Sequence, residues 1–573
     1  MRNRFALPLL LGASFALYGN SLAGGFVFDD LTTFRKDRIR GLSFLDLVHD
    51  YRPLRYLSLR IDETFFGDHP SGYHVVNTIL HGITSFAVFV VLRRLAGPVA
   101  ALAGALLFVA HPVHTECVAY ISGRRDILTT LFFLLGFLAW MTFCRTSRRP
   151  WLLAYLALYG LALSAKEMAV TLPVVCGLHD VLLDPAGFRR RLRVHVGMGV
   201  LAAAAAVYVA LSRAARQEHW HGGSMGANYA ISARLVVHYA MLLVFPLRLL
   251  GDYSYEAFPL SRSFLEARAL LSAAAVAAGV GAAYGLRRRA PRVVFGIGWF
   301  LVTLLPVLQI KPFHEIAAEH YLYLPSVGFC LLAGLGFDRL RARVGPRLAW
   351  IPLGVVLALF AVRTVVRNAD WRDSETFWHK TLETAPRCAR AHFNVGMVHA
   401  QRTEWSEAAA SIRRALAIRP EYLLARYQLG RIYGFLGRPD DAREQFEEAL
   451  RLAKTAESPS VDPGALCVHL DRLHEAIAFY ERRLAKGDHT RTALRALLGC
   501  QRALGVKAGR AGRVDEAQRR YRSALGAAEQ LLLLTPCDPD VLREAAELAS
   551  ALGDRSRAEE LRKRADAARR PPR

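Results

Sequence analysis

Long apolar runs separated by short polar connectors fill the first two thirds of the chain. After a run from Phe5 to Leu22, further runs lie at roughly 73–92, 98–116, 126–144, 151–165, 167–183, 194–212, 231–250, 267–286, 293–310, 320–338 and 348–366. About 20 apolar residues form a helix that crosses the hydrocarbon core of a bilayer. The pattern predicts an all-α, polytopic membrane domain over residues 1–368 with about 11 spanning helices.

Arg-rich connectors predict the orientation of these helices. Arginines follow several of the runs, and they favour the cytoplasmic side together with the N-terminus. Three runs lie between Arg193 and Arg287, where two cytoplasmic ends require an even number of crossings. We suspect that 231–250 does not cross, although a missed short span elsewhere also restores the parity. Eleven crossings place the C-terminal part outside. Ser21-Leu22-Ala23 also fits a signal-peptidase site, but we favour an uncleaved first helix.

The remaining residues show an internal repeat of 34 residues. Gly396, Gly430 and Gly464 are spaced by 34, and so are Ala408, Ala442 and Ala476 and also Ile412, Phe446 and Tyr480. This period with small and large residues in alternation is typical of the tetratricopeptide repeat. We predict a helical solenoid over 369–568 that opens with a half repeat, has about seven residues inserted near Gly505 to Arg513, and precedes a disordered tail, 569–573.

Composition excludes some classes of function. The chain is 53% hydrophobic with a net charge of +25, and its Arg clusters sit between apolar runs, so they indicate membrane orientation rather than a nucleic-acid partner. The eight cysteines show no paired spacing, so we predict neither a zinc site nor a disulfide framework. The Ala/Arg/Leu-rich composition favours a bacterial source.

Two adjacent carboxylates, Asp29 and Asp30, follow the first apolar run and open a long outer loop, 24–72. Such a pair also occurs in an N-cap or a solvated turn. Its position at the outer membrane interface favours a base that accepts the proton of a hydroxyl group. We slightly prefer Asp30, and the choice between the two stays open.

The other unusual polar residues gather on the same predicted outer face. They are Arg52, His111, His114, Glu116, Arg124, Asp126, Lys166, Glu167, Glu319, His320 and Tyr321. The His-x-x-His spacing of His111 and His114 also fits a metal, but Pro112 breaks the helix and no third ligand follows, so we predict no metal or other cofactor. Arginine suits contact with an anionic phosphate. Lys166-Glu167 also fits a self-neutralising pair, and Tyr321 an interfacial aromatic belt.

Together these motifs resemble the transmembrane and tetratricopeptide-repeat-containing O-mannosyltransferase family. The resembling strings are Gly25-Phe26-Val27-Phe28-Asp29-Asp30, Tyr51-Arg52-Pro53-Leu54, Gly72-Tyr73-His74-Val75-Val76-Asn77, His111-Pro112-Val113-His114-Thr115-Glu116, Gly123-Arg124-Arg125-Asp126, Ser164-Ala165-Lys166-Glu167 and Glu319-His320-Tyr321-Leu322-Tyr323-Leu324-Pro325. The resemblance extends from Gly25 through the repeats. At His320 it leads us to expect arginine instead.

The resemblance implies a GT-C fold and a transferase that takes a sugar, mannose by analogy, from a polyprenyl-phosphate carrier. The expected catalytic element is the acidic pair of the first outer loop, and the acceptor is a Ser/Thr hydroxyl of an exported polypeptide presented by the repeats. The expected partners are therefore the lipid-linked sugar, the polypeptide and membrane lipid, at a bacterial inner membrane with the site and repeats in the periplasm. Two alternatives stay open: a transferase for envelope glycan or lipid, and a non-catalytic repeat scaffold.

Overall fold

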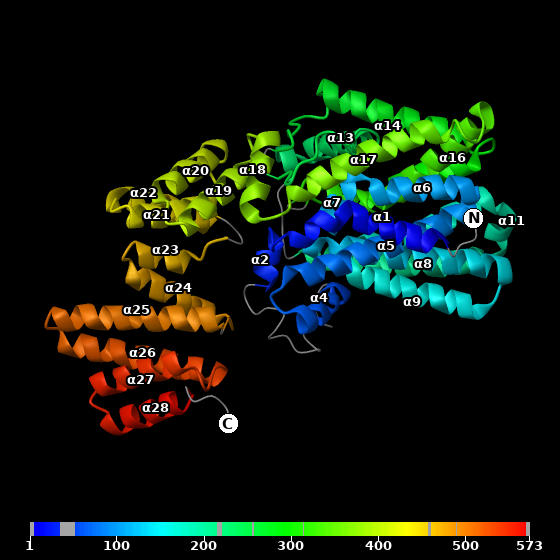
Figure 1. Cartoon of the computed structure of the whole chain (residues 1–573). Coiled ribbons are helices and arrows are strands. Elements are labelled where there is room, and N and C mark those ends of the chain that lie inside the picture. Colours follow the sequence, from blue (N-terminus) through cyan, green and yellow to red (C-terminus); the bar gives the residue numbers. More distant parts are fainter. Residues whose placement is uncertain are drawn as a thin grey trace. The chain divides into compact units, whose positions relative to one another are not determined.

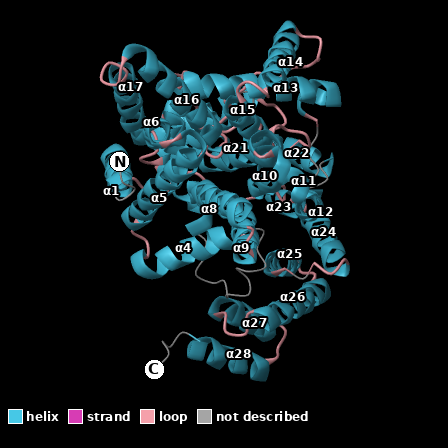
Figure 2. Ribbon diagram, turned by 90° about the vertical axis from the view of Figure 1, so that its right-hand side faces the viewer, coloured by secondary structure: helices cyan, strands magenta, loops and turns pink. Residues whose placement is uncertain are grey.

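The computed structural model describes residues 5–34, 52–214, 220–254, 257–312, 315–455, 460–488 and 490–568. Every regular element in these ranges is a helix (Figure 2). The chain divides into two compact units, Met1–Val395 and Gly396–Arg573. The predicted all-α fold is confirmed, whereas the predicted tail 569–573 lies outside the described residues.

The first unit contains the apolar helices (Figure 1). Its α-helices are α1 (Ala6–Tyr18), α2 (Asp29–Phe34), α4 (Pro53–Phe66), α5 (Pro70–Ala96), α6 (Pro98–Ala110), α7 (Thr115–Val118), α8 (Arg124–Thr146), α9 (Arg149–Ala165), α10 (Leu172–Leu183), α11 (Pro185–Arg190), α12 (Leu192–Ala214), α13 (Met225–Val244), α14 (Ala267–Leu286), α15 (Pro291–Leu304), α16 (Ser326–Val344), α17 (Trp350–Ala369) and α18 (Ser374–Thr384). Short 3-10 helices connect them: η2 (Gly19–Ala23), η3 (Pro112–His114), η4 (Ile121–Gly123), η5 (Glu167–Thr171), η6 (His221–Gly223), η7 (Leu305–Val307) and η8 (Glu319–Leu322).

Each predicted apolar run falls on a helix. Within the described ranges six helices are long and apolar enough to cross a membrane: Ala6–Ala23, Pro70–Ala96, Ile121–Thr146, Met225–Val244, Ala267–Leu286 and Trp350–Ala369. A seventh candidate, Pro98–Ala110 with Pro112–Val118, bends by 50°, at the proline where a break was predicted. Leu192–Val207 and Pro291–Val307 are shorter apolar helices. The count of about 11 crossings stays a prediction.

Helix α13 is unbroken, so the structure gives no sign that this segment fails to cross the membrane. The run 231–250, suspected of not crossing, lies largely in this helix, which is 20 residues long and ends at Val244. Phe245 and Pro246 follow directly, and proline cannot continue a helix. By length and composition α13 is itself a candidate span.

Small residues bring the helices of the first unit together. A Cβ on Gly104 of α6 would lie 2.6 Å from the carbonyl oxygen of Cys330 in α16, and one on Gly334 of α16 would lie 2.3 Å from that of Ala100. Only glycine permits this approach of two backbones, as is common where helices pack in membranes. The core around this contact includes Trp140 and Trp299, which are fully buried.

The second unit is the helical solenoid. Its elements begin with α19 (Ala389–Gln401), which starts in the first unit, and continue with α20 (Trp405–Ile418), α21 (Leu423–Phe435), α22 (Pro439–Thr455), α23 (Pro463–His469), α24 (Leu473–Ala485), α25 (Arg491–Arg510), α26 (Val514–Leu534), α27 (Pro539–Ala551) and α28 (Arg555–Ala568). Figure 1 shows them stacked as successive helical hairpins. The repeat architecture is therefore as predicted.

The repeat glycines have one shared role. A Cβ at Gly396, Gly430, Gly464 or Gly505 would lie within 2.7 Å of a side-chain atom sixteen residues further on: Ile412, Phe446, Tyr480 and Tyr521 respectively. The larger residue fills the space that the missing side chain leaves in the paired helix. Because Gly505 and Tyr521 keep this offset, the seven inserted residues lie between Tyr480 and Gly505, not in the predicted interval from Gly505 to Arg513. They lengthen α25 to 20 residues.

The first unit extends beyond the predicted boundary at residue 368. Trp371, Phe377 and Trp378 share a buried core with Val27 and Tyr120, and this core reaches Val395. The predicted boundary matches the end of the last apolar helix, α17 at Ala369. The opening half repeat, α18, packs with the membrane-domain helices.

Candidate active site

A glycine turn positions the residues that begin α8. A Cβ on Gly123 would lie 2.5 Å from the carbonyl oxygen of Glu116 and 2.8 Å from Cys117 Cα. Without a side chain at this position, η4 folds back on α7, and α8 starts at Arg124. The close turn therefore sets the directions of two adjacent arginines.

Arg124 points into the fold and is fully buried. Its Nε donates to Asn77 Oδ1 at 2.6 Å, one terminal nitrogen lies 2.5 Å from Asp62 Oδ2, and the other donates to the carbonyl oxygen of Tyr73 at 3.0 Å. All three guanidinium nitrogens are engaged with α4 and α5. This geometry opposes the predicted substrate contact, because Arg124 joins helices instead of facing an open space.

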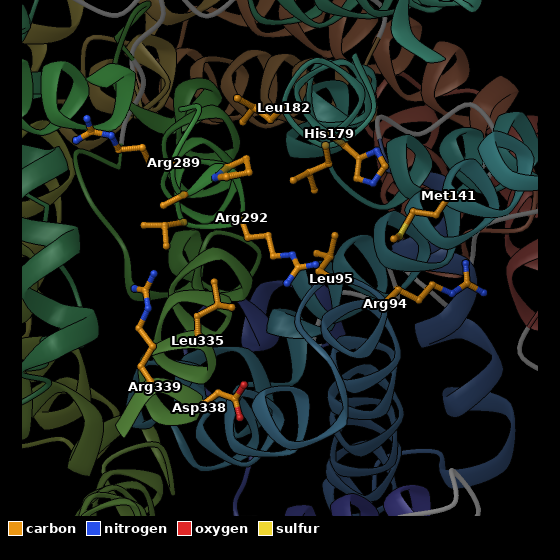
Figure 3. Close-up of a pocket in the computed structure, with 14 residues that line it drawn as sticks. Arg94, Leu95, Met141, His179, Leu182, Arg289, Arg292, Leu335, Asp338 and Arg339 are labelled. Carbon is orange, nitrogen blue, oxygen red and sulfur yellow. The ribbon is translucent and has the colours of Figure 1, made fainter. Parts of the chain in front are cut away.

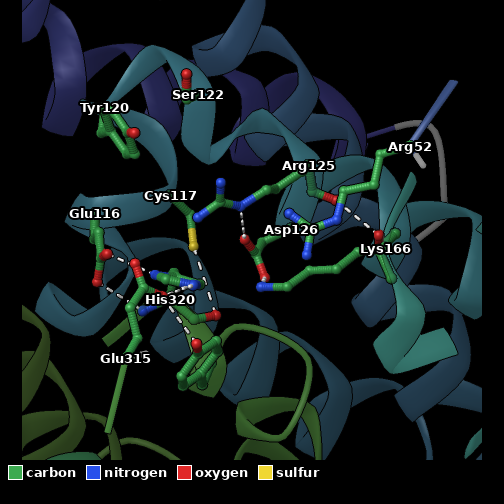
Figure 4. Close-up of polar contacts among 12 residues, drawn as sticks. Arg52, Glu116, Cys117, Tyr120, Ser122, Arg125, Asp126, Lys166, Glu315 and His320 are labelled. Atoms are coloured by element: carbon green, nitrogen blue, oxygen red, sulfur yellow. Dashed lines mark hydrogen bonds and ion pairs between the residues drawn. The ribbon is translucent and has the colours of Figure 1, made fainter. Parts of the chain in front are cut away.

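Arg125 faces a cluster of acids. Its Nε lies 3.5 Å from Asp126 Oδ2 and has no hydrogen-bond partner among the described residues. Asp29 and Glu315 also act electrostatically on its guanidinium group. Figure 4 shows Arg125 between Asp126 and the Glu116–Glu315 side of the cluster. Sequence reasoning passed over Arg125 in favour of its neighbour.

One lysine–acid pair and one arginine–acid pair lie next to this cluster (Figure 4). Lys166 Nζ donates to Asp126 Oδ1 at 2.6 Å and lies 4.9 Å from the centre of the Tyr321 ring. Arg52 donates to both carboxylate oxygens of Glu167, at 3.0 and 2.9 Å. The structure thus brings four predicted site residues into two buried or partly buried ion pairs, and Lys166 of one pair lies over a fifth, Tyr321. The alternative of a self-neutralising Lys166–Glu167 pair is not what the structure shows, because Lys166 pairs with Asp126 and Glu167 with Arg52.

The loop that carries the acidic pair has an unusual backbone. Phe28 has a φ of +57°, a left-handed conformation that non-glycine residues rarely adopt. Its ring contacts Tyr120, Phe377 and Trp378 at centroid distances of 5.6 to 6.0 Å. The guanidinium carbon of Arg390 lies 4.6 Å from the ring centre. These contacts stabilise the turn from which α2 begins.

Asp30 is anchored and has almost no exposed surface. Its side chain is 1% exposed. Oδ1 accepts from the backbone nitrogen and hydroxyl of Ser122, at 2.9 and 2.5 Å, and Oδ2 accepts from the nitrogen of Val27 at 3.3 Å. Burial raises the pKa of Asp30 to about 7, against the opposing effect of the Ser122 hydrogen bond. Asp29, the first residue of α2, is only half-buried.

The segment before α16 supplies Glu315, His320 and Tyr321 to the cluster. Glu116 accepts from the backbone nitrogen of His320 at 2.8 Å and lies 2.5 Å from His320 Nδ1. Tyr321 donates to Glu315 Oε2 at 2.9 Å. Burial raises the pKa of Glu315, but His320 and Arg125 outweigh it and hold the pKa below its ordinary value. His320, in the position where arginine was expected, is held in place by Glu116.

Three predicted residues are hydrogen-bonded within the fold. Glu319 is fully buried, accepts from Tyr253 at 3.2 Å and lies 3.4 Å from Arg367. His111 Nε2 lies 2.9 Å from the carbonyl oxygen of Leu243, and His114 bridges the carbonyl oxygen of Phe108 and Ser326 Oγ at 2.8 and 3.0 Å. Both histidines are buried and hydrogen-bonded within the fold, which opposes a role in substrate contact. In the described ranges no group of three or more His, Cys, Asp or Glu side chains has the geometry of a metal site.

Sequence reasoning missed Ser122, Arg125 and Glu315. Ser122 precedes the glycine turn and meets Asp30 from 92 positions away. Arg125 stood within a recognised motif, but the motif alone does not tell which of two adjacent arginines faces the site. Glu315 lies in the polar segment before Glu319, four positions away from the motif that was singled out.

These observations define a multi-span helical membrane domain with a polar, partly buried acid–base cluster, followed by a tetratricopeptide solenoid. Comparison with known proteins agrees on both parts. Residues 53–212 match the family described as dolichyl-phosphate-mannose-protein mannosyltransferase, and residues 388–455 match the tetratricopeptide repeat. The membrane domain is therefore similar in sequence to a family of membrane glycosyltransferases.

Curated animal proteins are similar over more than two thirds of this chain. The human protein O-mannosyl-transferase TMTC4 is 30% identical over 476 residues, which cover 68% of this chain and 63% of the relative. The mouse protein O-mannosyl-transferase TMTC3 is 26% identical over 522 residues, covering 80% and 55%, and the Drosophila melanogaster protein O-mannosyl-transferase Tmtc1 is 28% identical over 535 residues, covering 73% and 62%. The chain is thus related to the transmembrane and tetratricopeptide-repeat-containing O-mannosyltransferases, and it spans less than two thirds of the length of these relatives.

Proposed function

We propose that the chain transfers a sugar, mannose by analogy with its relatives, from a polyprenyl-phosphate carrier to Ser/Thr hydroxyls of exported polypeptides. The observation that carries the proposal is the half-buried Asp29 beside the anchored Asp30, within electrostatic reach of Arg125. A base, a cation and a rigid support are the groups that a displacement at an anomeric carbon requires.

Accessibility reverses the slight preference for Asp30. A base must approach the hydroxyl whose proton it accepts, but Asp30 is 1% exposed and both its oxygens already accept hydrogen bonds. Asp29 shares the first turn of α2 and has more exposed surface. We therefore assign the base to Asp29 and the positioning of its loop to Asp30.

The cation for the leaving phosphate is assigned by its unused hydrogen-bond donor. Arg124, Arg52 and Lys166 each form a close ion pair with an acid, whereas Arg125 lies 3.5 Å from Asp126 without a hydrogen bond to it. Arg125 has a buried Nε–H without a hydrogen-bond partner among the described residues. As the carbon–oxygen bond to the carrier breaks, Arg125 stabilises the charge that grows on the phosphate, while the acceptor oxygen forms the new bond and gives its proton to Asp29. A single displacement of this kind inverts the anomeric configuration.

The remaining expectations extend this proposal. The Arg-rich connectors support a site and repeat array on the periplasmic side of a bacterial inner membrane. An acceptor held weakly by repeats on the same chain would have a raised effective concentration without tight binding. Donor, acceptor and orientation are parts of the proposal that separate experiments test.

Glycopeptide mass spectrometry of exported proteins tests the proposed function. We compare the parent strain, a deletion strain and strains carrying Asp29→Asn or Asp68→Asn; Asp68 is an exposed acid in the same outer segment. Hexose on Ser/Thr peptides is expected to disappear in the deletion and Asp29→Asn strains and to persist with Asp68→Asn at equal protein level. Unchanged glycopeptides in the deletion strain contradict a protein acceptor, and altered envelope glycans there favour the alternative acceptor.

A further inference from the structure

A polar cavity lies at the helix ends remote from the acid–base cluster. It has a volume of about 700 Å³ and is bordered by the ends of α5, α8, α10 and α16 and the start of α15 (Figure 3). The lining arginines are Arg94, Arg289, Arg292 and Arg339. The volume lies in the range of ligand sites in proteins.

This cavity is separate from the candidate active site. Asn77 and Arg94 are both in α5, and Arg125 and Met141 are both in α8, with the first of each pair at the active-site end and the second at the cavity. At 1.5 Å per residue, about 17 residues of helix separate the two regions by roughly 25 Å. A ligand in the cavity does not reach the acid–base cluster.

The charge of the cavity is strongly positive. Asp338 is its one carboxylate, and Arg341 outside the cavity lies 3.3 Å from it. Arg94 donates to the carbonyl oxygen of Leu138 and to Thr142 Oγ1, which fixes its position at the end of α8. Arg292 and Arg339 are exposed and form no ion pair among the described residues. They therefore keep their donors for an anion.

Apart from His179 and Asp338, the rest of the lining is apolar. Leu95, Met141, Leu182 and Leu335 lie between the arginines, and Figure 3 shows Arg292 extending across the space toward Leu95. A free phosphate ion would leave this apolar surface and most of the volume unfilled. An amphiphile with an anionic head and hydrocarbon chains matches both the arginines and the leucines.

We infer that this cavity binds the phosphate head group of an anionic glycerophospholipid. Arginine presents a planar fork of donors to the phosphate oxygens, and basic pockets between membrane helices at the polar interface hold such head groups. The acyl chains leave along the leucine-lined wall toward the bilayer. The bound lipid would tie α5, α10, α15 and α16 together at the ends where their connectors repel one another.

Lipid retention on the purified full-length protein tests the inference. The protein in mild detergent is incubated with phosphatidylglycerol or with phosphatidylcholine of the same chains, and bound lipid is counted by native mass spectrometry. The parent should retain phosphatidylglycerol preferentially, and Arg292→Gln/Arg339→Gln should lower this retention roughly tenfold. The matched control is Arg288→Gln/Arg343→Gln, because it removes the same charge from the same two segments outside the cavity.

Size-exclusion profiles first confirm that all variants are folded. If the cavity and control variants lose phosphatidylglycerol equally, the lipid is held only by the overall positive charge of the protein. If the cavity variant retains as much lipid as the parent, the cavity does not bind it. Either result overturns the inference. A third arm uses millimolar inorganic phosphate as the probe on lipid-free protein. A further outcome is that the cavity variant abolishes phosphate binding and yet retains lipid as the parent does. In that case the ligand is free phosphate and the lipid assignment is wrong.

Discussion

Exchanging either of the two adjacent arginines at the start of α8 for glutamine separates a structural role from a catalytic one. Arg124→Gln leaves Asp62, which is 5% exposed, without its ion partner. Removing one member of a buried ion pair costs about 3–5 kcal/mol of stability. We therefore expect Arg124→Gln to lower the melting temperature and the yield of folded protein.

Arg125→Gln should have the opposite profile. Asp126 keeps Lys166 as its partner at 2.6 Å, so the fold retains a paired acid. Loss of a donor that acts on the growing charge of the transition state lowers kcat by roughly a hundredfold to a thousandfold. The melting temperature should stay close to that of the parent.

The measurements are thermal unfolding in detergent and transfer of mannose from a polyprenyl-phosphate donor to a Ser/Thr peptide. The double variant Arg124→Gln/Asp62→Asn removes the orphaned charge, and it should recover much of the stability that Arg124→Gln loses. If Arg124→Gln is as stable as the parent but inactive, the roles of the two arginines are reversed and the argument from their directions fails.

Three further predictions follow from the same structure. Asp29→Asn should abolish transfer at an unchanged melting temperature, whereas a folded variant that keeps full activity would remove Asp29 as the base. Burial raises the pKa of Asp30 from 3.8 to about 7, so its charge destabilises the fold progressively as pH rises from about 4 to 7. The parent should therefore lose stability relative to Asp30→Asn over this pH range, and parallel stability curves would refute the linkage. Gly430→Ala places a Cβ 2.7 Å from Phe446 and should cost about 1–3 kcal/mol, while Gly434→Ala on the same helix meets nothing within 4 Å and should be neutral or stabilising, as thermal unfolding of the two variants would show.

Periodic features were predictable from the sequence because they depend on neighbours a few positions apart. The apolar runs, the break at Pro112 and the 34-residue repeat all belong to this class. The site depended instead on contacts between distant segments: Asp30 meets Ser122 from 92 positions away, and Glu116 meets His320 from 204. Adjacent residues on a helix point about 100° apart, so the motif that contains Arg124 and Arg125 did not reveal which one faces the acids.

The repeat array and the acidic loop cannot be separated at the end of the last apolar helix. Phe28 holds a left-handed backbone, which for a residue of this size costs of order 1–3 kcal/mol, so other contacts must offset that cost. Phe377 and Trp378 of the half repeat supply part of the packing against its ring, and the carbonyl oxygen of Arg372 accepts from the Gly25 nitrogen at 2.8 Å. The direction in which Asp29 and Asp30 leave this turn thus depends on residues beyond 368. The half repeat that opens the solenoid is therefore a structural part of the first unit, and the second unit begins only in α19.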